Sequence, residues 1–458
     1  MESKFLRGIA IGIVLAIALS LTSGATHAAH HLDLMQQPPT SPAQAAPGAA
    51  EPSAPETAQK KITAYTLPPD LYRKAHNLGT IAFWGQLVAA FYAMFALWLL
   101  LRWKTAAKIR GWAEKASSKR FVQALIFAPL FFLAFDVLCM PTGIFQQWVL
   151  RKFGLSIQGW GSWLWDWTKG EIIIYICAVI LVWVLYAVIR KSPRRWWFYF
   201  WAVAVPLGIF YFFLTPWLIN PLFFKFEPLA QKDPPLTASL ERMVQRAGED
   251  IPPERMFWMG ASEKYTALNA YVTGIGASKR MVVWDTTIRK MTTPQIVSVA
   301  GHEMGHYVLN HIWKGIAFFS ALAFIFFYLV FRSIGWVLER KGAGWGIRGV
   351  DDWASLPALL LLLLILFFVA SPIANAFSRY IERQADQYGL EVTHGLTPDS
   401  GQVAAQAFQV LGEVDLADPD PSFADILLFE DHPVIPDRVR FALTYDPWAH
   451  GGQGEFVK

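Results

Sequence analysis

Residues 292–311, TTPQIVSVAGHEMGHYVLNH, place three of the chain's ten histidines within ten positions. Thr293 followed by Pro294 predicts the start of a helix, because threonine caps helices and proline is tolerated in their first turn. His302 and His306 are four residues apart, so both imidazoles lie on one helix face and can bind one metal ion, with Glu303 beside them to accept a proton from water. An ordinary polar helix face and a chance match remain alternatives for so short a pattern.

A catalytic zinc ion needs a third protein ligand. The segment NAFSRYIERQADQYG, residues 375–389, follows the last apolar run, and its polar residues recur at helical spacing. We predict a helix that ends at Gly389, with Glu382 as the third ligand. Asp386, one turn later, would orient a ligating imidazole. A solvated polar face is the alternative for this segment.

Composition identifies the chain as a membrane protein. Of its 458 residues 54% are hydrophobic and 16% are charged, and the mean hydropathy is +0.32. The chain has 21 tryptophans, which favour the membrane interface, and the segment WGSWLWDW (160–167) is either interfacial or the core of a buried loop. Seven apolar runs have about the length needed to cross a bilayer, namely residues 5–23, 78–101, 121–140, 171–190, 196–219, 315–338 and 356–376.

The polar stretch between the fifth and sixth of these runs predicts a small α+β unit. PPLTASLERMVQRAG (234–248) has apolar residues at helical spacing and a glycine stop, so it predicts an amphipathic helix. RMFWMGA (255–261) and RMVVWDT (280–286) are rich in strand-forming residues and flank a glycine-containing turn. The predicted fold is therefore a mainly α-helical polytopic membrane protein, with about six or seven spans and a small α+β zinc metalloprotease unit.

The chain divides into four predicted parts. Residues 1–28 predict a signal peptide or a retained N-terminal anchor, and residues 29–61 a Pro/Ala-rich linker. Residues 62–219 form an N-terminal membrane-helix domain, and residues 220–458 a metallopeptidase domain that includes the spans 315–338 and 356–376. The two cysteines, Cys139 and Cys177, lie in or beside apolar runs without a metal or redox spacing. No nucleic-acid motif occurs, so the expected partners are the lipid bilayer and a substrate.

An ordered series of motifs resembles the type I CaaX prenyl protease family of membrane zinc metallopeptidases over residues 78–446. The motifs are WVLRKFGLSIQ, INPLFFKFEPL, NAYVTGIGASKRMVVWDT, HEMGHYVLNH, SRYIERQAD and HPVIPDRVRFAL, in family order. The resemblance implies one Zn²⁺ per chain and assigns a role to each site residue. It makes His302, His306 and Glu382 the metal ligands, Glu303 the general base, Asp386 and Arg379 the supporting residues, His432 and Arg438 the groups near the reacting carbonyl, and Asn269, Ala270 and Tyr271 the substrate strand.

The family implies a zinc metalloendopeptidase that removes the C-terminal tripeptide from prenylated CaaX proteins, or a general membrane-protein protease where prenylation is absent. His311 is then a residue that lines the site or supports the structure, and it is not a ligand. Two alternatives remain. A site-2 type intramembrane metalloprotease typically takes its third ligand from an aspartate in a distant span. A non-enzymatic carrier or scaffold with structural zinc would close the site with four protein ligands.

Two observations conflict on the side of the membrane that the site faces. The loop at 102–120 has seven basic residues and one acidic residue, and the loop at 190–195 has four basic residues and no acidic residue. Short basic loops remain in the cytoplasm, which places the catalytic part outside. The family instead presents its catalytic domain to the cytosol. The loop charges lead us to expect the outward orientation.

Overall fold

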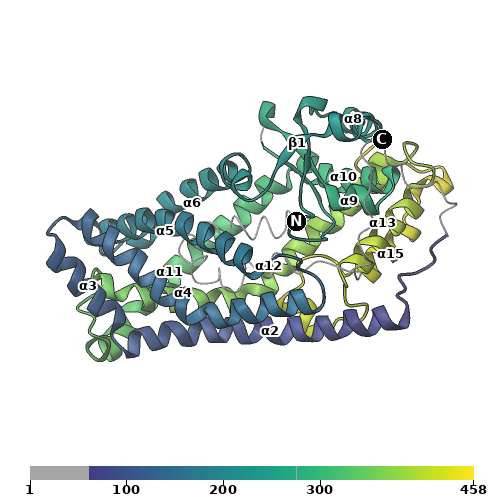
Figure 1. Ribbon diagram of the computed structural model, residues 1–458. Helices are drawn as coiled ribbons and strands as arrows, with labels where there is room; N and C mark the ends of the chain where they lie inside the picture. Colours follow the sequence, from purple (N-terminus) through teal and green to yellow (C-terminus); the bar gives the residue numbers. More distant parts are fainter. Residues whose placement is uncertain (1–60, 275) are drawn as a thin grey trace.

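The computed structural model describes residues 61–274 and 276–458. The predicted signal peptide or anchor at 1–28, with its candidate span 5–23, lies outside the described residues, as does the linker up to residue 60. Six helices in the described part are long and apolar enough to cross a membrane. They include every candidate span from residue 78 onward, and they lie alongside one another in an elongated bundle (Figure 1). The polytopic fold predicted from composition is therefore confirmed.

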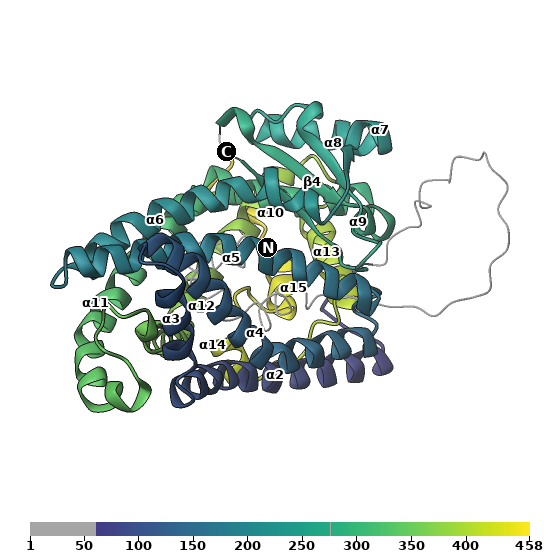
Figure 2. The ribbon, with the colours of Figure 1, turned by 60° about the vertical axis from the view of Figure 1, so that its left-hand side comes forward.

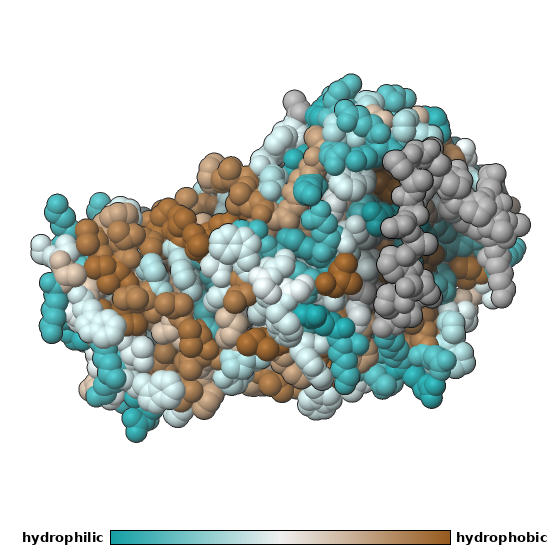
Figure 3. Space-filling model, in the orientation of Figure 1, coloured by the Kyte–Doolittle hydropathy of each residue, from teal (hydrophilic) through white to brown (hydrophobic). Residues whose placement is uncertain are grey.

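The membrane helices come in two groups along the chain. The first group is α2 (Pro69–Arg102), α4 (Arg120–Lys152), α5 (Trp160–Lys191) and α6 (Trp196–Leu214), and the second is α11 (His311–Trp345) and α12 (Leu356–Thr393). A short helix, α3 (Thr105–Ala116), connects α2 to α4, and α6 continues through a π-helical turn, Thr215–Ile219, and a 3-10 turn, Asn220–Leu222. Apolar side chains gather over the helical part of the surface in Figure 3, whereas hydrophilic ones cover the α+β part.

The tryptophan-rich stretch 160–167 is not a buried loop core. It forms the first turns of α5, and its interfacial position stays a prediction. Trp160 and Trp165 are exposed on this helix end, which suits indole rings at a membrane interface.

A four-stranded sheet forms the centre of the α+β unit. Its strand order is β1 (Phe226–Pro228), β2 (Met256–Met259), β4 (Arg280–Trp284) and β3 (Ala270–Thr273). β2 and β4 are parallel, and the other two pairings are antiparallel. The two strands predicted at 255–261 and 280–286 are confirmed as β2 and β4. β3 lies at one edge of the sheet.

The two sheet faces are covered by different parts of the chain. Met281 and Val283 face α8 (Pro234–Arg246) and α10 (Thr293–Val308), whereas Val282 and Trp284 face apolar residues of α2 and α4. The predicted amphipathic helix at 234–248 is α8, and its four predicted apolar residues are all buried. The sheet thus packs between α10 on one face and the membrane helices α2 and α4 on the other. Figure 2 shows β4 near α10 and α9 (Asp285–Lys290).

The remaining short elements complete the catalytic half. Beyond α12 the chain forms three helices that pack against the second half of α12. They are α13 (Ser400–Val414), α14 (Phe423–Leu428) and α15 (Ile435–Thr444), and Figure 1 labels two of them, α13 and α15. The other short helices lie in the connections between the larger elements. They are α7 (Leu229–Lys232), α9 and 3-10 turns at Pro253–Arg255, Gly276–Ser278, Trp353–Ser355 and Pro447–His450.

Two glycines allow α10 and α12 to approach closely. A Cβ atom on Gly389 would lie 2.9 Å from the backbone nitrogen of His302, and one on Gly305 would lie 3.0 Å from the Cβ of Tyr388. Both distances are shorter than ordinary contacts, so a larger residue at either position would force neighbouring atoms to move. The predicted helix end at Gly389 is wrong, because α12 continues to Thr393. This glycine instead brings the two helices together.

Candidate metal centre

The helix that carries the histidine pair begins one residue earlier than predicted. Thr292, not Thr293, is its N-cap, and the side chain of Gln295 accepts a hydrogen bond from the Thr292 backbone N–H at 2.9 Å. This reciprocal arrangement is a capping box, which satisfies otherwise unpaired N–H groups at the helix start. His302 and His306 lie one turn apart further along α10, and both are buried.

Glu382 of α12 meets the two imidazoles of α10. The Nε2 atoms of His302 and His306 are 3.2 Å apart. The Glu382 carboxylate oxygens lie 3.2 Å from Nε2 of His302 and 3.7 Å from Nε2 of His306. The ligand atoms of the three residues all lie within 4.8 Å of one another. The structure therefore brings together the three residues that the sequence selected as metal ligands.

The chemistry of this cluster fits a metal cation. Glu382 has 0% of its surface exposed, and within the described part of the chain neither of its carboxylate oxygens accepts a well-aligned hydrogen bond. A buried carboxylate without donors is costly unless a cation compensates it. Two imidazole nitrogens and one carboxylate are the donor set of many catalytic zinc sites.

A second pair of charged residues holds His302 from its other side. The ring Nδ1 of His302 lies 2.8 Å from a carboxylate oxygen of Asp386, and Arg438 of α15 donates two hydrogen bonds to the same carboxylate, at 3.0 and 2.5 Å. Burial opposes protonation of His302, but the hydrogen bond with Asp386 and the nearby Glu382 carboxylate outweigh it and raise the pKa of His302 to about 9. The site therefore favours positive charge where the ligands converge.

Glu303 and His432 complete the inner cluster. One carboxylate oxygen of Glu303 is buried and accepts no hydrogen bond from the described residues. Nε2 of His432 lies 3.3 Å from the Glu382 carboxylate, and its Nδ1 lies 2.8 Å from a carboxylate oxygen of Asp431. The family resemblance implied a place for His432 near the reacting carbonyl, and in the structure it lies at the metal-ligand cluster.

Arg379 and Asn375 attach the His432 loop to α12. The guanidinium of Arg379 donates hydrogen bonds to the backbone carbonyls of Ile426, at 2.7 Å, and Glu430. The side-chain amide of Asn375 donates to the carbonyl of Leu427 at 3.2 Å. The polar line predicted on α12 therefore has two parts: its first residues hold a loop, and its later residues face the metal-ligand cluster.

The predicted substrate strand is the edge strand β3, preceded by Asn269. The backbone of Asn269 is already bonded to Trp284 and to the hydroxyl of Thr287. Ala270 and Tyr271 belong to β3, which packs beside α10, and all four residues of the strand are buried. Asn269, Ala270 and Tyr271 thus lie next to the metal-site helix, with their strand covered by other parts of the chain.

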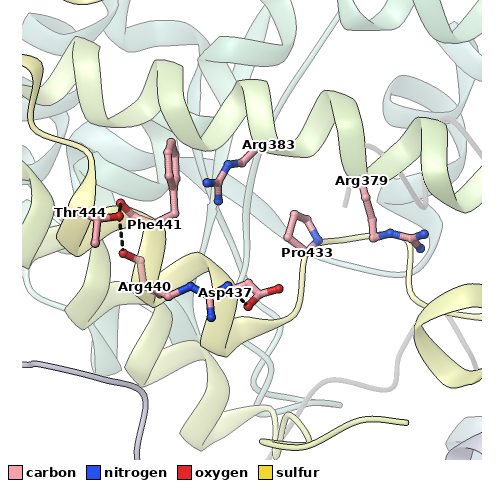
Figure 4. A pocket seen from close by; sticks show the side chains of 7 residues that line it. All are labelled: Arg379, Arg383, Pro433, Asp437, Arg440, Phe441 and Thr444. Carbon is pink, nitrogen blue, oxygen red and sulfur yellow. Dashed lines mark hydrogen bonds and ion pairs between the residues drawn. The ribbon is translucent and has the colours of Figure 1, made fainter. Parts of the chain in front are cut away.

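A separate pocket of about 400 Å³ lies between α12 and α15 (Figure 4). Its lining shares only Arg379 with the predicted site, and in Figure 4 the Arg379 guanidinium lies away from Arg383 and Phe441. The Arg383 guanidinium lies over the ring of Phe441, and Arg440 pairs with Asp437 at 2.6 Å. The full lining is Arg379, Arg383, Pro433, Asp437, Arg440, Phe441 and Thr444.

Gln384 is a site residue that the sequence did not indicate. It lies on α12 between Glu382 and Asp386, and its side-chain oxygen is 3.2 Å from Nε2 of His311. His311 itself is fully buried behind His306. A glutamine carries no charge and no metal-ligand pattern, so no sequence signal distinguished it from a surface residue.

Comparison with known proteins identifies the family. Residues 230–446 match the model for peptidase family M48, and residues 51–225 match the model for the CAAX prenyl protease N-terminal region with five membrane helices. The uncharacterized metalloprotease YhfN of Bacillus subtilis is 34% identical over 348 residues, which cover 76% of this chain and 80% of that protein. The chain belongs to peptidase family M48.

More distant M48 relatives include named prenyl proteases. CAAX prenyl protease 1 of Saccharomyces cerevisiae is 29% identical over 48% of this chain and 50% of its own length. The human CAAX prenyl protease 1 homolog is 23% identical over 68% of this chain and 73% of its own length. The crystal structure of S. mikatae Ste24p has the same fold, with a TM-score of 0.71 and 21% identity over 96% of this chain and 99% of that one. This M48 protein is therefore an integral multi-pass membrane metalloprotease of the CaaX prenyl protease type, as the motif series predicted.

Proposed function

We propose that His302, His306 and Glu382 bind a single zinc ion, which serves peptide hydrolysis. The observation that carries the proposal is the fully buried Glu382 carboxylate, which lies 3.2 Å from one imidazole Nε2 and 3.7 Å from another. Three protein ligands leave one coordination position for water, as in catalytic sites, whereas structural zinc sites are closed by four.

The residues around this site support a general-base mechanism. When bound, zinc would polarise a peptide carbonyl and lower the pKa of a coordinated water molecule. Glu303 takes the proton from the attacking water and delivers it to the leaving amine. Its buried carboxylate oxygen accepts no hydrogen bond from the described residues, so this oxygen can accept one from a water molecule.

His432 and Arg438 have different roles in this proposal. The side chain of His432 is 20% exposed and lies at the Glu382 carboxylate, so it can donate a hydrogen bond to the substrate carbonyl as negative charge develops there. Arg438 lies 3.4 Å from Nδ1 of His302, on the side of the ring away from Glu382. We therefore assign Arg438 an orienting role with Asp386 instead of the predicted place near the reacting carbonyl.

A peptide substrate would lie along β3 beside α10. In the antiparallel register, the Trp284 backbone N–H donates to the Asn269 carbonyl, so Ala270 and Val272 direct their backbone groups away from β4. These groups can pair with an extended peptide by strand addition. Because β3 is buried, its covering side chains must move for a peptide to enter.

Prenylated CaaX peptides that lose their last three residues are the substrate class we propose. The names of the yeast and human relatives support this class. Purified protein should cleave a farnesylated CaaX peptide and leave the same peptide without the farnesyl group intact. Equal cleavage of both peptides would instead support general proteolysis of membrane proteins.

The proposed orientation places the metal site outside the cytoplasm. The basic segment 102–120 contains α3, and the basic segment 190–195 leads from α5 into α6; α3 lies at the end of the bundle opposite α10 (Figure 1). Short basic loops favour the cytoplasm. We expect alkaline phosphatase fused after Lys458 to be active, and the same enzyme fused within 102–120 to be inactive; the reverse pattern would establish the cytosolic orientation. We also propose that the chain divides between residues 219 and 220 into an N-terminal membrane-helix domain and a C-terminal metallopeptidase domain.

A further inference from the structure

His311 connects a metal-ligand candidate to the membrane helix α11. It is the first residue of α11 and has 0% of its surface exposed. Its Nδ1 lies 3.2 Å from Nδ1 of His306, and its Nε2 lies 3.2 Å from Oε1 of Gln384. Side chains from α10, α11 and α12 therefore form one continuous hydrogen-bonded chain that ends at the imidazole of His306.

The hydrogen-bonding capacities of these atoms determine where the protons lie. Nε2 of His306 faces Glu382 and His302, so a metal ligand needs its lone pair on that nitrogen and its proton on Nδ1. That proton is donated to Nδ1 of His311, which must accept it and therefore carries its own proton on Nε2. The second proton is donated to the amide oxygen of Gln384, which can only accept.

The two histidine ligands thus have different supports. His302 is held by the Asp386 carboxylate, which is paired with Arg438. His306 is held by a neutral imidazole and a neutral amide. A neutral support orients the ring and selects the tautomer without placing a second buried charge beside the ligands, which would be costly.

The backbone at the start of α11 helps to place His311. Asn310 adopts the left-handed conformation, with φ of 57°, which asparagine tolerates better than most residues. This residue turns the chain from α10 into α11, so His311 projects back toward His306. The orientation of the metal ligand therefore depends on the position of a membrane-spanning helix.

On the basis of the zinc site proposed above, we propose that His311 and Gln384 are positioning residues that hold His306 in the tautomer and ring orientation that bind the metal. Loss of such supporting hydrogen bonds typically weakens metal binding about 10- to 100-fold. The hydrogen bonds of His311 and Gln384 differ from the support by Asp386, because they act on His306 instead of His302 and involve no charged group.

Five proteins test the proposal: wild type, His311→Leu, His311→Asn, Gln384→Leu and Tyr380→Phe. Asparagine at 311 keeps an acceptor near the position of Nδ1, whereas leucine removes it. Tyr380→Phe is the matched control, because the Tyr380 hydroxyl contacts the amide nitrogen of Gln384, at 3.3 Å, and not the oxygen used in the chain. Zinc affinity is measured by chelator competition in detergent, with thermal unfolding of the metal-free proteins and the absorption spectrum of Co²⁺-substituted protein as further readouts.

We expect the two leucine variants to bind zinc about 10- to 100-fold more weakly and to alter the Co²⁺ spectrum, while His311→Asn and Tyr380→Phe stay close to wild type. Wild-type affinity in either folded leucine variant would overturn the inference, as would binding by His311→Asn as weak as that of His311→Leu. If His311→Leu does not fold, Gln384→Leu and His311→Asn decide the result. Failure of the wild-type protein itself to bind zinc would overturn the proposed function, and this inference with it.

Discussion

Replacing Asp386 with asparagine tests the electrostatic support of the site. Asp386 and Arg438 are 3% and 8% exposed and are joined by two hydrogen bonds, at 3.0 and 2.5 Å. Asp386→Asn keeps an oxygen that can accept from His302 but leaves the guanidinium buried without a counter-charge. Breaking one partner of a buried ion pair costs about 3–5 kcal/mol, so we expect a loss of that size in the free energy of unfolding of the metal-free protein.

A double-mutant cycle separates the pair from its surroundings. Arg438→Met should also destabilise the protein, and the double variant Asp386→Asn/Arg438→Met should lose less than the sum of the single losses, with a coupling energy of up to about 3 kcal/mol. Unfolding by denaturant in detergent micelles, followed by tryptophan fluorescence, measures each value. Arg440→Met is the control, because its pair with Asp437 is exposed and should change stability by less than about 1 kcal/mol. Strictly additive losses from the two buried residues would refute the reasoning.

Three further predictions follow from the packing and the titration of single residues. Gly389→Ala should weaken zinc binding and cost about 1–3 kcal/mol of stability through overpacking, because its Cβ would meet the backbone of His302; Gly335→Ala, which meets no atom within 4 Å, should be neutral in the same zinc titration and unfolding assays. Val272→Pro should raise KM or stop peptide cleavage in protein that still folds and binds zinc, because proline removes the Val272 N–H that points away from β4; unchanged kinetics would exclude strand addition. Burial, together with the nearby Asp418 carboxylate, raises the pKa of Asp425 to about 6, so ionising it costs stability as the pH rises from about 4 to 6; Asp425→Asn should gain about 1 kcal/mol at pH 7.5 and nothing near pH 4 in unfolding experiments, and a gain independent of pH would contradict this.

The sequence predicted the features that depend on local pattern. Helical spacing and residue chemistry identified His302, His306 and Glu382, and apolar length identified the six described spans. The alternation of strand-forming residues located β2 and β4. These features follow from periodicity and side-chain type, which a single sequence displays directly.

Other features depend on contacts between distant segments. Gly389 resembles a helix stop in the sequence, but α12 continues to Thr393, and the glycine instead allows the backbone of His302 to approach. Gln384 supports His311 only because α11 and α12 pack together, and Arg438 lies behind His302 because α15 folds back onto α12. Such roles arise from tertiary packing, which leaves no mark on local sequence pattern.

The most direct test of the zinc peptidase assignment compares two glutamates of the same site. Glu303→Gln should keep one bound zinc ion and lose peptide hydrolysis, because Glu303 acts on water, whereas Glu382→Ala should lose both, because it removes a ligand. Zinc content by atomic absorption and cleavage of a farnesylated peptide are measured on the same purified samples. Full zinc occupancy in Glu382→Ala, or normal hydrolysis by Glu303→Gln, would contradict the account.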